Sequence, residues 1–179
     1  MIPDIPDFFA KGYFMDTIIL SLLVDNTSGV LSRIAGLFSR RAYNIDSLTV
    51  GVTANPRISR MTIVSRGDNL VLNQIVAQLK KQEDVRDVKV LENDSSVVRE
   101  EILVKVSSDV TNRRDIIAIA DIFRANIVDV QKDSLIIELT GTQHKLAALL
   151  DMLSDFQILE IARTGVTGLA RGAKDVKFF

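Results

Sequence analysis

The 179-residue sequence contains no cysteine, a single histidine and three prolines, and it has no apolar run long enough to cross a bilayer. The lack of cysteine excludes disulfides and cysteine-ligated zinc and suits a cytoplasmic location. A membrane-spanning helix needs about 20 predominantly apolar residues, so none is expected. The 22 basic and 23 acidic residues are mixed along the chain, which leaves no basic field of the kind that binds nucleic-acid backbones.

The residue types that usually carry out catalysis are nearly absent. His144 lies at a predicted helix start, where a solvated side chain is the simplest interpretation, and one histidine without a second ligand makes no metal site. Neither a nucleophile elbow nor a phosphate-binding P-loop occurs. The acid pair Glu100-Glu101 is interpreted as a solvated strand edge. We therefore expect no catalytic residues, no metal ligands and no cofactor of the chain's own.

Two copies of one hydrophobic pattern fill the chain, each in the order strand, helix, strand, strand, helix, strand. The segments of the first copy are 17–25, 29–42, 44–53, 58–66, 72–79 and 85–91. Those of the second copy are 101–107, 116–123, 127–130, 135–139, 146–153 and 158–162. The predicted fold class is α+β, with two tandem ferredoxin-like βαββαβ units.

The repeat predicts a division into a first domain at residues 17–93 and a second at 99–173. A short polar linker near residues 92–96 joins them. Residues 1–16, which contain two of the three prolines, are interpreted as an N-terminal extension, and residues 174–179 as a C-terminal tail.

Two other functions of this pattern are disfavoured by the residues. The RNA-recognition motif shares the βαββαβ order, but it stacks bases on aromatic side chains of its third strand. Neither 58–66 nor 134–141 contains an aromatic residue. The glycine-rich segment TGVTGLARG, 164–172, is a weak candidate for phosphate, because phosphate loops run from a strand into a helix. A flexible or partner-docking tail is favoured there.

The turn DNTSG, Asp25 to Gly29, separates the first strand from the first helix. Thr27 or Ser28 is expected to cap that helix. The turn also suits a free amino acid, because a helix amino end presents unpaired N–H groups and a positive dipole end to a carboxylate. Gly29 lets a ligand approach the backbone, and the Asn26 amide both donates and accepts. The corresponding turn of the second copy, 107–115, has no glycine, so no equivalent site is expected there.

Three segments, 25–51, 59–64 and 163–172, resemble the small regulatory subunits of acetohydroxyacid synthase, also called acetolactate synthase. The resemblance covers roughly residues 15–172, and the first unit looks like an ACT domain, the amino-acid-sensing βαββαβ module. It implies a non-catalytic subunit that binds and activates a catalytic large subunit, to which thiamine diphosphate, magnesium and FAD would belong. It also implies feedback inhibition by valine or another branched-chain amino acid, and homodimers paired through their ACT domains.

Carried over residue by residue, the resemblance implies an effector site made of Asn26, Gly29, Val30, Leu31, Asn44 and Ile45. Val30 and Leu31 would contribute backbone N–H groups, Asn44 a contact from the partner chain, and Ile45 an apolar wall. The family often has glutamate where this chain has Asp25 or Thr27. The second unit would serve dimerisation or hold the catalytic subunit. The alternative is an ACT-type sensor of a different enzyme or a transporter.

Overall fold

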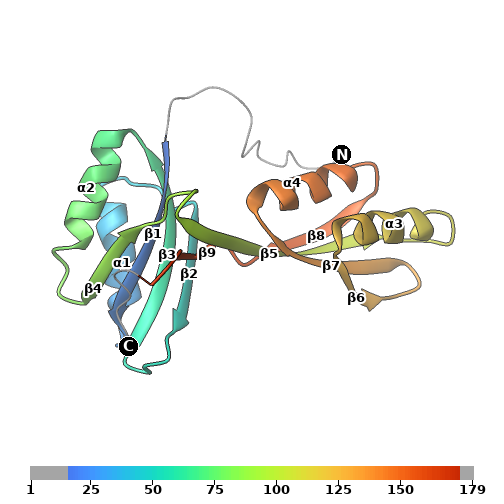
Figure 1. The fold of residues 1–179 in the computed structure, drawn as a ribbon. Coiled ribbons are helices and arrows are strands. Elements are labelled where there is room, and N and C mark those ends of the chain that lie inside the picture. Colours follow the sequence, from blue (N-terminus) through green and yellow to red (C-terminus); the bar gives the residue numbers. More distant parts are fainter. Residues whose placement is uncertain (1–15, 174–179) are drawn as a thin grey trace. The chain divides into compact units, whose positions relative to one another are not determined.

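The computed structural model describes residues 16–173 of the chain, whose fold is shown in Figure 1. The elements of the first repeat are β1 Asp16–Asp25, α1 Val30–Arg40, β2 Ser47–Val52, β3 Ile58–Gly67, α2 Asn69–Leu79 and β4 Val85–Val90. They are followed by β5 Ser96–Ser107, α3 Arg113–Phe123, β6 Asn126–Val130, β7 Ser134–Gly141, α4 Gln143–Met152, β8 Ile158–Arg163 and β9 Thr167–Ala170.

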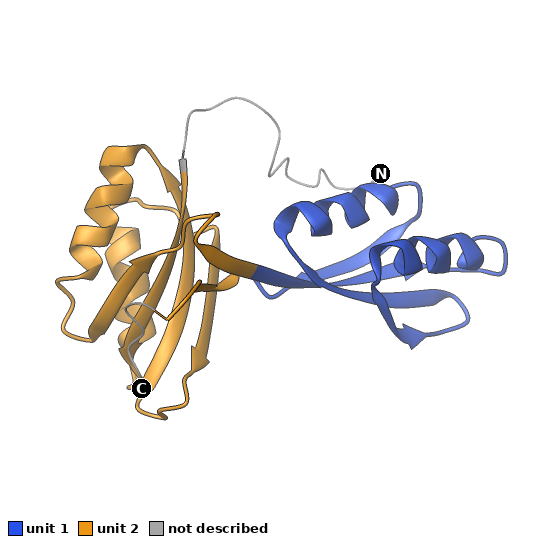
Figure 2. Ribbon diagram, in the orientation of Figure 1, with its two compact units in different colours: residues 1–11, 99–165 blue, residues 12–98, 166–179 orange. Residues whose placement is uncertain are grey.

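The described residues form two compact units (Figure 2). The unit that comes first in the chain, orange in the figure, contains residues 16–98 and 166–173, and the second, blue, contains residues 99–165. The first contains a sheet in the order β2-β3-β1-β4, and the second a sheet in the order β6-β7-β5-β8. All strand pairs of these two paths are antiparallel. Both orders are those of a ferredoxin-like unit, so the predicted fold class is confirmed.

Each unit has its own apolar core between its sheet and its two helices. The predicted helical stripes supply it, because residues spaced by three and four lie on one face of a helix. The buried helix residues of the first core are Val30, Ile34, Leu37, Phe38, Leu72, Ile75 and Leu79. Those of the second are Ile116, Ile119, Ala120, Leu146, Leu149 and Leu150.

The second face of the first sheet is covered by the chain itself. The helices α1 and α2 lie on one face, while β9 and the start of β5, which pair with each other, lie on the other (Figure 1). The covering residues Leu91, Val166 and Gly168 are buried. The outward-facing residues of β1 and β3 beneath them are only 1–5% exposed; these are Ser21, Leu23, Thr62 and Val64. Many antiparallel sheets have one face in contact with solvent. In this unit both faces of the sheet are covered.

Two segments differ from the sequence-based expectation. β5 begins at Ser96, inside the expected linker, and continues through the boundary between the units after residue 98. Residues 166–173 belong with the first unit rather than the second, and they form β9 there instead of a flexible tail. Gly168 explains the fit, since a Cβ at this position would lie 2.9 Å from Leu91 Cδ1 and 3.1 Å from the Val97 carbonyl oxygen. The pattern of hydrophobic residues in the sequence does not predict this close contact at Gly168.

The proposed N-terminal extension and C-terminal tail fall almost wholly outside the described residues, apart from Asp16, which begins β1. Within residues 16–173, no helix is both long enough and apolar enough to span a membrane.

Candidate functional site

The DNTSG turn enters α1 through a left-handed glycine. Gly29 occupies the N-cap position with φ 83°, a conformation that costs little only in a residue without a Cβ. No side chain caps α1, so the expected cap by Thr27 or Ser28 is wrong. The Val30 N–H reaches the Thr27 carbonyl at 3.5 Å, a long contact for a hydrogen bond. The start of α1 thus presents backbone donors without a side-chain acceptor.

Asn26 is held in place by the turn between β2 and β3. Its backbone N–H donates to the Arg57 carbonyl at 2.7 Å, and its side-chain amide donates to the Pro56 carbonyl at 2.8 Å. Because the amide nitrogen faces Pro56, the Oδ1 atom faces the other way. An amide oxygen is an acceptor, which suits the ammonium group of an amino acid.

Two arginine–carboxylate pairs flank the turn. Arg33 donates to both oxygens of Asp84 at 2.6 and 2.9 Å, and Arg86 donates to both oxygens of Asp25 at 2.7 and 2.5 Å. The hydrogen bond from Arg86 holds the pKa of Asp25 below its usual range. The Arg33 guanidinium also lies over Gly29, since a Cβ there would be 2.8 Å from Arg33 Nη1. These partners are 51 and 61 residues apart, and sequence reasoning missed them.

The turn that leads into α3 in the second unit already holds a carboxylate. Asp109 Oδ1 accepts hydrogen bonds from the Thr111 N–H at 2.7 Å, the Asn112 N–H at 3.0 Å and the Thr111 hydroxyl at 2.5 Å. The bond from the Thr111 hydroxyl is the main cause that lowers the pKa of Asp109, with the backbone bonds adding to it. The two backbone donors precede Arg113, the first residue of α3, so they correspond in position to Ser28 and Gly29. A ligand carboxylate at the start of α3 would be repelled by the Asp109 charge, which gives a physical reason to expect one site per chain.

Val30 and Leu31 begin α1 beside Gly29 and point their side chains differently. The Val30 side chain is buried in the first core, whereas Leu31 is 45% exposed. Their backbone N–H groups lie in the first turn of the helix, where N–H groups have no hydrogen-bond acceptor within the helix. The structure therefore brings four of the six expected residues together: Asn26, Gly29, Val30 and Leu31.

Asn44 and Ile45 lie at the opposite end of the first sheet. The Asn44 carbonyl accepts a hydrogen bond from Ser65 Oγ at 2.6 Å, and Ser65 is paired with Ile18, eight residues before Asn26 in the chain. At about 3.3 Å per strand residue, the two asparagines are on the order of 25 Å apart. Ile45 packs partly buried against the core of its own unit. Within one chain these two residues do not join the other four.

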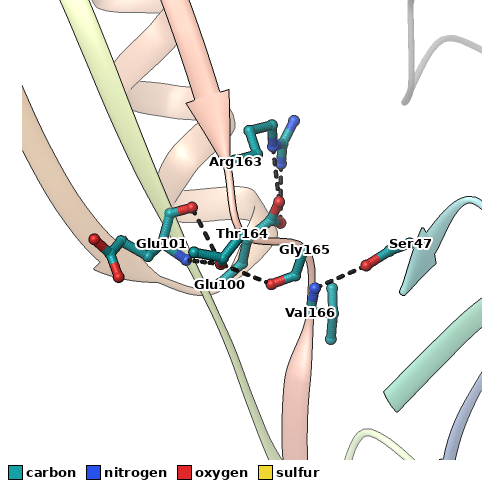
Figure 3. Close-up of polar contacts among 7 residues, drawn as sticks. All are labelled: Ser47, Glu100, Glu101, Arg163, Thr164, Gly165 and Val166. Carbon is teal, nitrogen blue, oxygen red and sulfur yellow. Dashed lines mark hydrogen bonds and ion pairs between the residues drawn. The ribbon is translucent and has the colours of Figure 1, made fainter. Parts of the chain in front are cut away.

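The remaining candidate residues have structural surroundings. His144 lies exposed in the first turn of α4, and residues 16–173 contain no group of three or more side chains able to hold a metal ion. The interpretation of Glu100 as a solvated edge is wrong. Glu100 is 5% exposed and accepts two hydrogen bonds from Arg163, at 2.8 and 3.0 Å (Figure 3).

Comparison with known proteins identifies the family of the chain. A family model described as the AHAS small subunit-like ACT domain matches residues 20–87, and a model of the small subunit of acetolactate synthase matches residues 99–172. The chain is 48% identical over 160 residues to the probable acetolactate synthase small subunit of Methanothermobacter thermautotrophicus, covering 89% of this chain and 95% of that protein. The chain belongs to the acetolactate synthase small-subunit family.

Other members are similar over the same extent. The acetolactate synthase small subunit of Bacillus subtilis is 47% identical over 158 residues, covering 87% of this chain and 91% of that protein. The crystal structure of the small subunit from Thermotoga maritima matches with a TM-score of 0.81 and 37% identity, covering 88% of this chain and 99% of that one. The family consists of regulatory, non-catalytic subunits built from ACT-type domains, which confirms the resemblance noted from the sequence.

Proposed function

We propose that this chain binds the catalytic subunit of acetolactate synthase, raises its activity and makes it sensitive to feedback inhibition by valine or another branched-chain amino acid. Its membership in the small-subunit family, over nearly the full length of the relatives, supports the choice of enzyme. In this proposal thiamine diphosphate, magnesium and FAD belong to the catalytic subunit, and the complex works in the cytoplasm.

The observation that carries the effector site is the difference between the two helix starts. The turn into α1 ends in a left-handed glycine, whereas the turn into α3 holds the Asp109 carboxylate on the Thr111 and Asn112 N–H groups, where its charge repels a ligand carboxylate. A ligand carboxylate at α1 accepts hydrogen bonds from the Val30 and Leu31 N–H groups and gains from the positive end of the helix dipole. The ligand ammonium donates to Asn26 Oδ1, so both charged ends of a free amino acid find partners.

The rest of the site comes from a second copy of the chain in this proposal. Asn44 is on the order of 25 Å from Asn26 within one chain, so it reaches the same ligand only from a partner. A homodimer paired through the ACT units supplies this arrangement twice, and Ile45 of the partner then offers apolar surface to the effector side chain. Because the site joins two chains, a bound effector stabilises one arrangement of the pair over another.

Feedback requires only a modest coupling between the effector site and the catalytic subunit. Allosteric coupling is typically about 1–3 kcal/mol, which corresponds to about a 5- to 150-fold change in affinity, and it acts equally in both directions. Valine should therefore change the affinity of the small subunit for the catalytic subunit by some factor, and the catalytic subunit should change the affinity of the small subunit for valine by the same factor.

The test is Gly29→Asp in the enzyme reconstituted with the acetolactate synthase catalytic subunit. The new carboxylate lies where the effector carboxylate should bind, so activation is retained and inhibition by valine is lost. Gly29→Asn is the matched control, because it has nearly the same shape and the same φ of 83° to accommodate without the charge, and asparagine tolerates this conformation. If valine inhibits the Asp variant as it inhibits the parent, the assigned site is wrong. Calorimetric titration with valine, leucine and isoleucine identifies the effector.

A further inference from the structure

The closing segment of the chain fixes a buried valine to strand β2. Val166 is fully buried. Its N–H donates to Ser47 Oγ at 2.8 Å (Figure 3), and its carbonyl accepts from Thr49 Oγ1 at 2.8 Å. Ser47 and Thr49 are two residues apart on β2 and so point to the same face of the sheet. Both polar groups of a buried peptide must be satisfied, and here two side chains of one strand satisfy them.

The residues just before Val166 are fixed within the other unit. Arg163 makes its two hydrogen bonds to the buried Glu100 carboxylate, and Thr164 Oγ1 accepts the Glu101 N–H at 3.1 Å (Figure 3). A bidentate pair between an arginine and a carboxylate fixes the relative orientation of the two side chains and also contributes energy. Along the chain, Gly165 alone separates Thr164 from Val166.

The strand that holds Val166 begins at the proposed effector contacts. Asn44 Nδ2 donates to Asp46 Oδ1 at 2.6 Å, and the other Asp46 oxygen accepts from Arg66 Nε at 2.8 Å. The Asp46 N–H donates to the Val64 carbonyl at 2.8 Å, and Ser47 follows directly. An effector that accepts from the second Asn44 N–H, or draws the amide away from Asp46, acts directly on the group that holds the start of β2.

We propose that Ser47 and Thr49 transmit effector binding from the start of β2 to Val166, and through the closing segment to the second unit. This inference rests on the proposed function, because it takes Asn44 as an effector contact. Ser47 and Thr49 are positioning residues, since they act through Val166 and not by touching the effector. A shift of β2 that moves either hydroxyl also moves Val166. In this proposal the chain between Val166 and Arg163 passes that movement to the second unit.

The test is the double variant Ser47→Ala with Thr49→Val, reconstituted with the catalytic subunit. Both hydroxyls are lost at nearly constant shape. We expect the variant to bind valine with an unchanged Kd in calorimetry and to activate the enzyme as the parent does. The ratio of activities without and with saturating valine falls at least about fivefold, the lower end of typical allosteric coupling. The matched control, Ser47→Thr with Thr49→Ser, keeps both hydroxyls and keeps the inhibition.

Amide hydrogen exchange provides a second measurement that does not depend on the variant folding. Valine should change the protection of the Val166 N–H in the parent and in the control variant. A purely structural contact would show no dependence on valine, and that result overturns the inference. Full inhibition of the hydroxyl-free variant overturns it too, as does loss of valine binding by that variant. If the parent itself neither binds nor responds to valine, the proposed function fails first.

Discussion

The carboxylate of Asp109 lies 2.7 Å from the backbone nitrogen of Thr111, in the turn that leads into α3. The second unit thus places a fixed negative charge in the turn where the first unit has Gly29. The two repeats share one topology, and they differ at the position where a charged ligand would bind.

Replacing Asp109 by Ala should destabilise the second unit in a pH-dependent manner. The folded-state pKa of Asp109 lies below the ordinary value of 3.8, so its contribution is fully present above pH 3.8 and is lost as the pH falls through the lower folded value. The difference in urea midpoint between parent and variant should therefore shrink in strong acid. Asp109→Asn, which keeps an acceptor but does not titrate there, should lose less stability. A difference between parent and D109A that is constant down to pH 2 would contradict this account.

The Glu100–Arg163 pair should respond unequally to removal of its two members. Glu100 is 5% exposed and Arg163 is 34% exposed. Arg163→Ala leaves a buried carboxylate without its partner, which costs on the order of 2–4 kcal/mol. Glu100→Ala costs less, because the freed guanidinium can reach water. Denaturant unfolding of both variants measures the order. Equal losses, or a greater loss for E100A, would show that the carboxylate has other means of stabilisation.

Gly168→Ala should destabilise the first unit and release β9. The added Cβ would lie 2.9 Å from Leu91 Cδ1, 3.0 Å from Val98 Cγ2 and 3.1 Å from a backbone oxygen, and overpacking of this kind costs about 1–3 kcal/mol. Gly51→Ala is the matched control, because a Cβ there meets nothing within 4 Å; its change should stay within about 0.5 kcal/mol. Thermal unfolding compares the two variants, and similar melting temperatures would argue against close packing at Gly168.

Two variants that each abolish valine binding should restore it when combined in one dimer. Asn26→Ala removes the oxygen that accepts from the effector ammonium, and Asn44→Ala removes the contact expected from the other chain. A mixed dimer has one site with both asparagines intact, because each chain supplies the residue that the other lacks. Co-expression with two affinity tags, followed by calorimetry, should give one valine per mixed dimer. Mixed dimers that bind no valine would exclude a site shared between chains in this way.

The elements that followed from the sequence are those with strong local patterns. The apolar residues that recur at helical spacing are buried as expected: Leu72, Ile75 and Leu79 of α2 and Leu146, Leu149 and Leu150 of α4. The order of elements predicted the ferredoxin-like topology. The turn before α1 was recognised because glycine and asparagine carry local meaning in a turn. Its cap was wrongly assigned to Thr27 or Ser28, since Gly29 itself occupies the N-cap position.

The features that were missed depend on contacts between residues far apart in the chain. Nothing in the neighbourhood of Glu100 indicates that Arg163, 63 residues later, buries and pairs it. The strand β9 is only four residues long and contains a glycine, so neither periodicity nor strand propensity marks it. The distance between Asn26 and Asn44 depends on the direction of β1 and β3 in the sheet, which the order of elements alone left undetermined.

The return of residues 166–173 to the first unit has a consequence for the order of folding during synthesis. A ribosome releases residues 16–98 first, yet part of the cover on the outward side of their sheet, residues 166–173, emerges only after all of residues 99–165. Domains generally fold as units as the chain emerges, but this one is begun first and completed last. In the interval one face of its β-sheet is incompletely covered, and a nascent chain stalled within the second unit is the form most in need of a chaperone.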